Sequence, residues 1–226
     1  MSFTLYGLED VYRALGDLGS KTPAAAKVAI NAAARETRKL MIARAKARYA
    51  VNAAGQRHLK DLKQKRKATN NRLGATLYIS SLRNDLGYFK TTPRHPTHFT
   101  GNAWRHGPSV WKGKVLKSES MKPLPGQGNR SKAFLAEFKS GHVGMVQRVV
   151  GSKSRNTTTQ KSGKPRWRNR QGKVEKLVTL GSPSATAMHN MIWPGTEPEV
   201  AAYLLNRLDL QVQKVLQKAR NRRAGR

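Results

Sequence analysis

The chain has 226 residues, of which 44 are lysine or arginine and 12 are aspartate or glutamate, giving a formal net charge of +32. Such a surplus makes a free monomer repel itself and points to a polyanion or an acidic protein surface as its neighbour. The absence of cysteine excludes disulfides and thiolate metal sites.

No run of about 18 apolar residues predicts a transmembrane helix. The N-terminus is polar and includes two acids among its first ten residues, unlike a secretory signal peptide. We therefore expect a protein made and used in the cytosol, or a component of a virus particle.

The N-terminal part of the sequence predicts two helices. Residues 3–6 can form a short strand, and a short amphipathic helix that ends at Gly19 follows. Its apolar positions recur every three or four residues: Leu5, Leu8, Val11, Leu15 and Leu18. Thr22 and Pro23 resemble a helix start, and an alanine-rich helix is expected from there to about Tyr49.

A strongly basic segment, residues 56–72, comes next. Leu59 and Leu62 give it only a thin apolar edge, so we expect a solvated helix or arm. Residues 75–82 follow a glycine and are rich in β-branched and aromatic side chains, which predicts a strand.

Residues 92–130 contain five prolines and five glycines, which predicts a long irregular insertion. Trp104 and Trp111 are expected to pin this insertion to the domain surface or to a neighbouring subunit.

Residues 133–150 predict a β-hairpin. The apolar run 133–138 and the β-branched run 143–150 flank the turn pair Ser140-Gly141. Residues 152–173 then form a basic loop without any acid, too polar to bury itself. A further strand is expected at 174–180, closed by Gly181-Ser182-Pro183.

The C-terminal segment predicts a long helix. Thr196 is expected to cap it, with Glu199 completing a capping box and Pro198 in the first turn. Its apolar stripe is Val200, Leu204, Leu208, Val212 and Val215. The expected fold is α+β: one domain over 1–226, with a small antiparallel sheet packed against long N-terminal and C-terminal helices and decorated by two loop insertions.

The sequence contains no pattern typical of catalysis. The acids are scattered, and His95 and His98 lie in a Pro-rich loop without a third metal ligand nearby. Gly163-Lys164 is followed by Pro165, so a phosphate-binding Walker loop is absent. We expect no enzyme activity, no metal and no cofactor.

Two basic clusters are candidate binding sites. The first, a candidate for contact with DNA or another polyanion, consists of Arg57, Lys60, Lys63, Lys65, Arg66, Lys67 and Arg72. The second, a candidate for docking to a neighbouring protein ring, consists of Lys161, Lys164, Arg166, Trp167, Arg168 and Arg170. The first is dense enough to follow phosphates without reading bases. For both clusters, acidic protein surfaces remain the alternative to direct DNA contact.

The predicted β-hairpin also carries a sequence motif that resembles one in a known family. Phe134, the turn from Lys139 to Gly141, and Val146-Gln147-Arg148-Val149 followed by Gly151 are similar to the central hairpin of the phage minor tail protein Z family. The resemblance extends to the order of the other elements, beginning with Tyr6-Gly7-Leu8-Glu9 and continuing through Ala29-Ile30-Asn31. More distantly, the layout is similar to head–tail joining proteins of phage necks.

The resemblance implies a non-enzymatic virion protein that completes the head-proximal end of a long phage tail. It implies a homo-oligomeric ring, expected to be hexameric, through which genomic DNA passes. Expected neighbours are a tail terminator or tail tube protein and a head completion or connector protein, with assembly in the host cytoplasm and no membrane partner. The alternative is a standalone, sequence-nonspecific nucleic-acid-binding protein.

Overall fold

The structure, a computed structural model, describes residues 22–79, 84–96, 108–138, 140–154 and 170–224. They form helices and small antiparallel sheets, which confirms the predicted α+β class with long N-terminal and C-terminal helices. The strand and helix predicted before Thr22 lie outside the described residues. The chain divides into two compact units: unit 1 is Met1–Ala45, Leu59–Leu82 and Ser184–Arg226, and unit 2 is Lys46–His58 and Arg83–Pro183.

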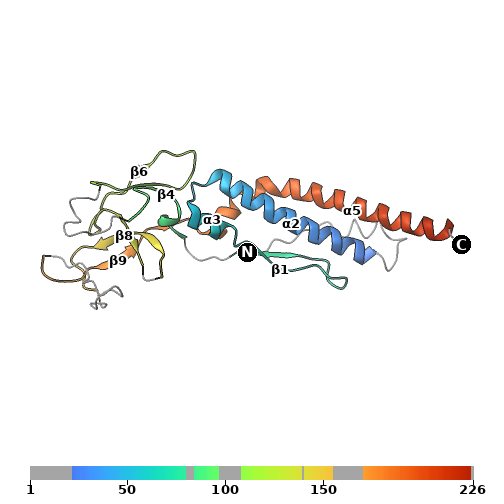
Figure 1. Ribbon diagram of the computed structural model, residues 1–226, viewed down its shortest axis with the longest axis horizontal. Coiled ribbons are helices and arrows are strands. Elements are labelled where there is room, and N and C mark those ends of the chain that lie inside the picture. The colour runs from blue at the N-terminus through green and yellow to red at the C-terminus, as the bar shows by residue number, and fades with distance from the viewer. Residues whose placement is uncertain (1–21, 80–83, 97–107, 139, 155–169, 225–226) are drawn as a thin grey trace. The chain divides into compact units, whose positions relative to one another are not determined.

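Unit 1 is built around two long helices, α2 (Thr22–Arg48) and α5 (Trp193–Ala224), which lie side by side and run in opposite directions (Figure 1). Their shared core contains Ala26, Ala29, Ile30, Ala33, Ala68, Leu204 and Leu208. Because alanine is small, the backbone of α2 can approach its neighbours closely, as its sequence indicates. Both bounds of α2 agree with the prediction to within one residue.

The start of the C-terminal helix differs from the prediction. The helix α5 already begins at Trp193, so Thr196 lies within it, where its hydroxyl donates to the carbonyl of Ile192 (3.0 Å). Glu199 completes no capping box and instead pairs with Arg44 of α2 (2.5 Å). The expected cap is therefore wrong, and Pro198 lies inside the helix rather than in its first turn. The helix α4 (Ala185–Asn190), capped by Ser184, precedes α5 and was not expected.

The basic segment after α3 (Ala53–Leu59) is extended rather than helical. Strand β1 (Lys63–Arg66) pairs in antiparallel fashion with β2 (Thr76–Tyr78). Of the two predicted forms, helix or arm, the helix is wrong for residues 60–72. The strand predicted over 75–82 is confirmed where the chain is described.

Unit 2 contains the predicted hairpin. Strand β7 (Phe134–Glu137) pairs with β8 (Val143–Val149), which pairs with β9 (Lys176–Thr179). Gly141 closes the turn with a φ of +76°, a conformation that favours glycine. The predicted hairpin and the strand within 174–180 are confirmed.

Other parts of unit 2 are more ordered than the sequence predicts. Strand β4 (Lys90–Thr92) pairs with β5 (Lys112–Lys114), and β5 with β6 (Lys122–Pro123), so the described part of the insertion contains strands rather than only irregular loop. Strand β3 (Asn84–Asp85) pairs in antiparallel fashion with β10 (Gly181–Ser182). Gly181 and Ser182, which were expected only to end the preceding strand, therefore form a strand of their own. The short 3-10 helix η2 (Leu86–Tyr88) links β3 to β4.

Trp111 is only 3% exposed, in the core of unit 2 with Phe89, Met145 and Val146. It thus anchors the insertion to its own chain, one of the two expected alternatives, whereas Trp104 lies outside the described residues. Among the helices in the described ranges, none combines the length and the hydropathy that crossing a bilayer requires.

Candidate nucleic-acid interface

The β1–β2 hairpin of unit 1 presents most of the first basic cluster. Its tip is closed by paired backbone hydrogen bonds: the Thr69 N–H donates to the Arg72 carbonyl (2.9 Å), and the Arg72 N–H donates back (3.2 Å). Residues 60–79 contain six lysines and arginines and a single acid, Asp61. The cluster is therefore carried by an extended ribbon rather than wrapped around a helix.

The two faces of the hairpin differ in chemistry. Successive side chains of a strand point to opposite faces, and Leu62, Leu77 and Ile79 are buried on the inner face. Lys63 and Tyr78 are direct cross-strand partners on the outer face. Burial of the inner apolar side chains thus fixes which side chains meet the solvent.

A β-bulge interrupts the strand alternation. The register shifts between Gln64 and Arg66, so Lys65 has no single partner on β2. Lys65, Arg66 and Lys67 are all exposed, although strict alternation would turn one of them inward. The bulge therefore accompanies three consecutive exposed cations.

Two side chains of α2 attach the hairpin to the helix. The Asn31 amide donates to the carbonyl of Ala68 (3.0 Å) and accepts from its N–H (3.0 Å), as a neighbouring strand would. Asn31 also accepts from the Gln64 amide (3.1 Å). Farther along α2, Arg38 donates to the carbonyls of Leu62 (2.5 Å) and Lys60 (3.1 Å). These bonds hold the backbone on both sides of β1, at Lys60, Leu62 and Ala68, and leave the lysines of the strand exposed.

Replacing Asn31 by alanine is expected to loosen the hairpin. The variant loses three hydrogen bonds and leaves the half-buried backbone groups of Ala68 without their partner, at a cost of about 1–3 kcal/mol. Hydrogen exchange of residues 60–79 should accelerate, while exchange in β7 and β8 of unit 2 stays unchanged. The matched Asn31→Asp variant retains the accepting oxygen and should show a smaller effect. Equal protection in wild type and Asn31→Ala would contradict this role.

The outer face is organised by weak contacts. Lys63 pairs with Asp61 (2.9 Å), but both side chains are largely exposed, so the pair contributes little to stability. The Lys65 ammonium lies 5.1 Å from the centre of the Tyr78 ring, a cation–π contact. The Arg72 guanidinium donates to the carbonyl of Lys67 (3.4 Å) across the tip.

The other predicted site residues are not all brought together. Arg57 is exposed on α3 and belongs to unit 2, so the first cluster is divided between the units. In the second cluster Arg170 is exposed, next to the turn at Gly172. The rest of that cluster lies outside the described residues: Lys161, Lys164, Arg166, Trp167 and Arg168.

Sequence reasoning missed Tyr78, Asn31 and Arg38. Leu62 is the one apolar residue among Leu62, Lys63, Gln64 and Lys65, so these four residues show no apolar–polar alternation that would have predicted the strand. No local signal indicates that Asn31 holds Ala68, because 37 residues separate them.

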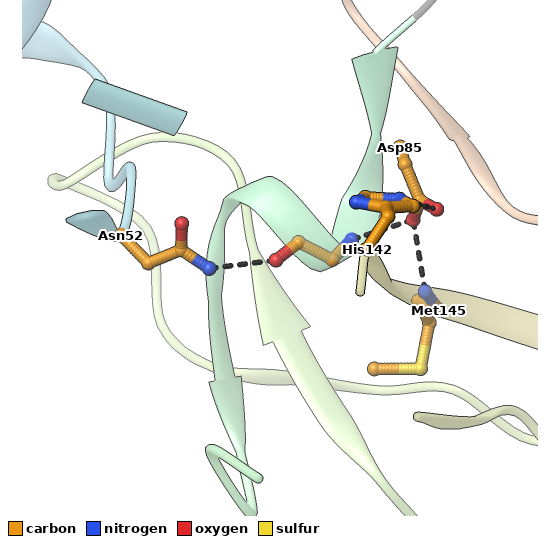
Figure 2. A network of polar contacts seen from close by, with 5 residues as sticks. Asn52, Asp85, His142 and Met145 are labelled. Atoms are coloured by element: carbon orange, nitrogen blue, oxygen red, sulfur yellow. Dashed lines mark hydrogen bonds and ion pairs between the residues drawn. The ribbon is translucent and has the colours of Figure 1, made fainter. Parts of the chain in front are cut away.

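Unit 2 contains a second polar cluster around the buried Asp85. The N–H groups of Gly87 (2.7 Å) and Met145 (2.9 Å) both donate to Asp85 Oδ1, and His142 Nε2 lies 3.0 Å from Oδ2. Figure 2 shows these contacts together with Asn52, whose amide donates to the Gly87 carbonyl (2.6 Å). A Cβ at Gly144 would collide with the Asp85 carboxylate, so this approach requires glycine.

The Asp85 cluster resembles part of a catalytic triad, and its contacts join η2 to β8. The contacts of His142 among the described residues are Asp85 and the rings of Tyr88 (4.7 Å) and Phe138 (5.8 Å) rather than a nucleophile. Burial and the neighbouring Asp85 charge raise the pKa of Tyr88, which keeps its hydroxyl protonated. In the described ranges no three His, Cys, Asp or Glu side chains converge as a metal site.

Comparison of the chain with protein-family models, curated proteins and solved structures finds no match.

Proposed function

We propose that this chain is a non-enzymatic structural protein that completes the head-proximal end of a phage tail, where it forms a ring and contacts DNA or acidic neighbouring rings. The proposal rests first on the resemblance to the minor tail protein Z family. Its neighbours would be a tail terminator or tail tube protein and a head completion or connector protein, with the genome passing through the lumen.

The observation that supports this role best is the packing of the residues that carry the resemblance. Phe134 and Val146 are cross-strand partners in β7 and β8, and the Arg148 guanidinium lies 4.9 Å from the centre of the Phe134 ring. Gly151, the last residue of the motif, has a φ of +78°. The described residues of this motif therefore belong to one packed structural unit, as expected for a motif that specifies a fold.

The charge supports a polyanionic or acidic neighbour. A ring lumen lined by lysine and arginine would hold a DNA end without reading its sequence, because phosphate contacts carry no base information. The alternative, a standalone nucleic-acid-binding protein, is favoured by the same basic hairpin. The two proposals differ in assembly: the first requires a ring on the phage tail, whereas the alternative requires a protein that binds nucleic acid as a monomer.

Electron microscopy of phage tails that contain this chain tests the role. We expect about six copies in a closed ring at the head-proximal end, since homo-oligomers favour closed symmetry. The isolated protein should remain monomeric at low salt, because a net charge of +32 opposes ring closure. A single copy at the neck, or none on purified tails, would contradict the ring; binding of RNA by the monomer would then favour the alternative.

A further inference from the structure

We propose that the outer face of the β1–β2 hairpin binds the sugar–phosphate backbone of duplex DNA. This inference rests on the proposed function and selects DNA over an acidic protein for this surface. We define this surface by the exposed side chains of the hairpin: Lys63, Lys65, Arg66, Lys67, Arg72 and Tyr78.

The arrangement of the cations favours phosphates over carboxylates. Lys65, Arg66 and Lys67 are consecutive and all exposed, owing to the bulge in β1. A protein partner would have to place a separate carboxylate against each of them. Duplex DNA offers about one negative charge per 1.7 Å of its axis, so it neutralises such a row in any register.

The hairpin is held in place before it binds. Asn31 and Arg38 fix the backbone of residues 60–68 to α2, and the buried Leu77 and Ile79 fix the returning strand. Binding therefore orders lysine and arginine side chains but not the ribbon, which lowers the entropic cost of association.

Attachment to α2 also determines the mode of contact. A free two-stranded ribbon can enter the major groove, but the inner face of this hairpin is covered by its own unit. Among the described residues the outer face is the accessible one, and its cations suit phosphates rather than base edges, so we expect it to follow the backbone without sequence preference. The exposed Tyr78 ring holds the Lys65 ammonium on this face, 5.1 Å from the ring centre, and offers an apolar surface to a sugar.

A salt titration with two charge-matched variants of the full chain tests the inference. The hairpin variant replaces Lys63, Lys65, Arg66 and Lys67 by glutamine. The control variant replaces four exposed cations of α5 in the same unit by glutamine: Lys214, Lys218, Arg220 and Arg222. Both lower the net charge equally, so they separate local contact from general attraction.

Affinity is measured by fluorescence anisotropy with a random-sequence duplex at several salt concentrations. The slope of log affinity against log salt should decrease in magnitude by about 3.6 in the hairpin variant, about 0.9 for each phosphate that is no longer neutralised. The control variant should keep a slope close to that of wild type. An unchanged slope in the hairpin variant, or an equal decrease in both variants with circular dichroism intact, overturns the inference.

Tail joining with the same variants separates this inference from the proposed function. A hairpin variant that binds DNA like wild type yet fails to join tails assigns the face to a protein partner and overturns the inference alone. Conversely, hairpin-dependent DNA binding by a protein that never associates with tails supports the inference and contradicts the tail role.

Discussion

Replacing Asp85 by alanine is expected to destabilise unit 2 by about 3–5 kcal/mol, since a buried polar cluster that loses its central acceptor leaves several donors unpaired. The Asp85 side chain accepts from the N–H groups of Gly87 and Met145, both buried, and contacts His142. These contacts join η2 to β8. Their loss should therefore loosen both elements together.

The matched Asp85→Asn variant separates geometry from charge. Its amide oxygen can still accept from both backbone N–H groups, so we expect a smaller loss of stability than in Asp85→Ala. Urea denaturation gives the free energies, and hydrogen exchange of β7 and β8 localises the change. An Asp85→Ala protein as stable as wild type would show that water replaces the carboxylate, and that the cluster is no joint.

The elements predicted well from sequence have strong local signals. The alanine-rich helix α2 starts at a Thr-Pro pair and is rich in strong helix formers. The β7–β8 hairpin combines two apolar runs with a turn whose Gly141 has a positive φ. In both cases residues near one another in the sequence determine the structure.

The hairpin that carries the candidate interface was harder to predict, because its structure depends on distant partners. Lysine-rich sequence has no strong strand preference, and the bulge at Gln64–Arg66 breaks the alternation that would reveal the strand. The ribbon is stabilised by Asn31 and Arg38, which lie more than 20 residues away. Sequence thus located the charges but not the surface that displays them.

The start of α5 shows a local signal overridden by tertiary contacts. Thr196 and Glu199 have capping-box spacing, but the helix extends back to Trp193. Pro194 lies at its second position, where a missing N–H costs nothing. The Glu199 carboxylate instead accepts a hydrogen bond from Arg44 of α2, and the same guanidinium donates to the Gly195 carbonyl. An interhelical contact therefore takes the carboxylate that the cap would have used.

Acidification is expected to destabilise unit 1 through His189 of α4. This side chain is fully buried, and among the described residues neither ring nitrogen makes a hydrogen bond of ordinary geometry. Burial lowers the pKa of His189 from 6.5 to about 4, although the backbone of Leu59 opposes part of the drop. The folded protein therefore keeps this imidazole neutral where an unfolded chain would protonate it.

The sign of the pH dependence follows from that difference. Above pH 6.5 the ring is neutral in both the folded and the unfolded state, so it does not change the free energy of unfolding with pH. Below pH 6.5 only the unfolded state gains a proton, and the free energy of unfolding therefore falls. The fall continues to about pH 4, below which both states are protonated, and amounts to about 3 kcal/mol at about 1.36 kcal/mol per pKa unit. Urea denaturation at several pH values measures this fall in the free energy of unfolding, and hydrogen exchange in α4 and α5 localises it.

A pair of variants isolates His189 from the other groups that titrate in this range. His189→Leu should keep most of its stability at pH 7, because the ring nitrogens it removes make no ordinary hydrogen bond to the described residues, and it should lose the acid-dependent fall. His95→Gln, at an exposed position of unit 2, should retain the full pH dependence of wild type. If His189→Leu and wild type lost stability in parallel between about pH 6.5 and 4, protonation of this buried ring would not be the cause of the acid sensitivity.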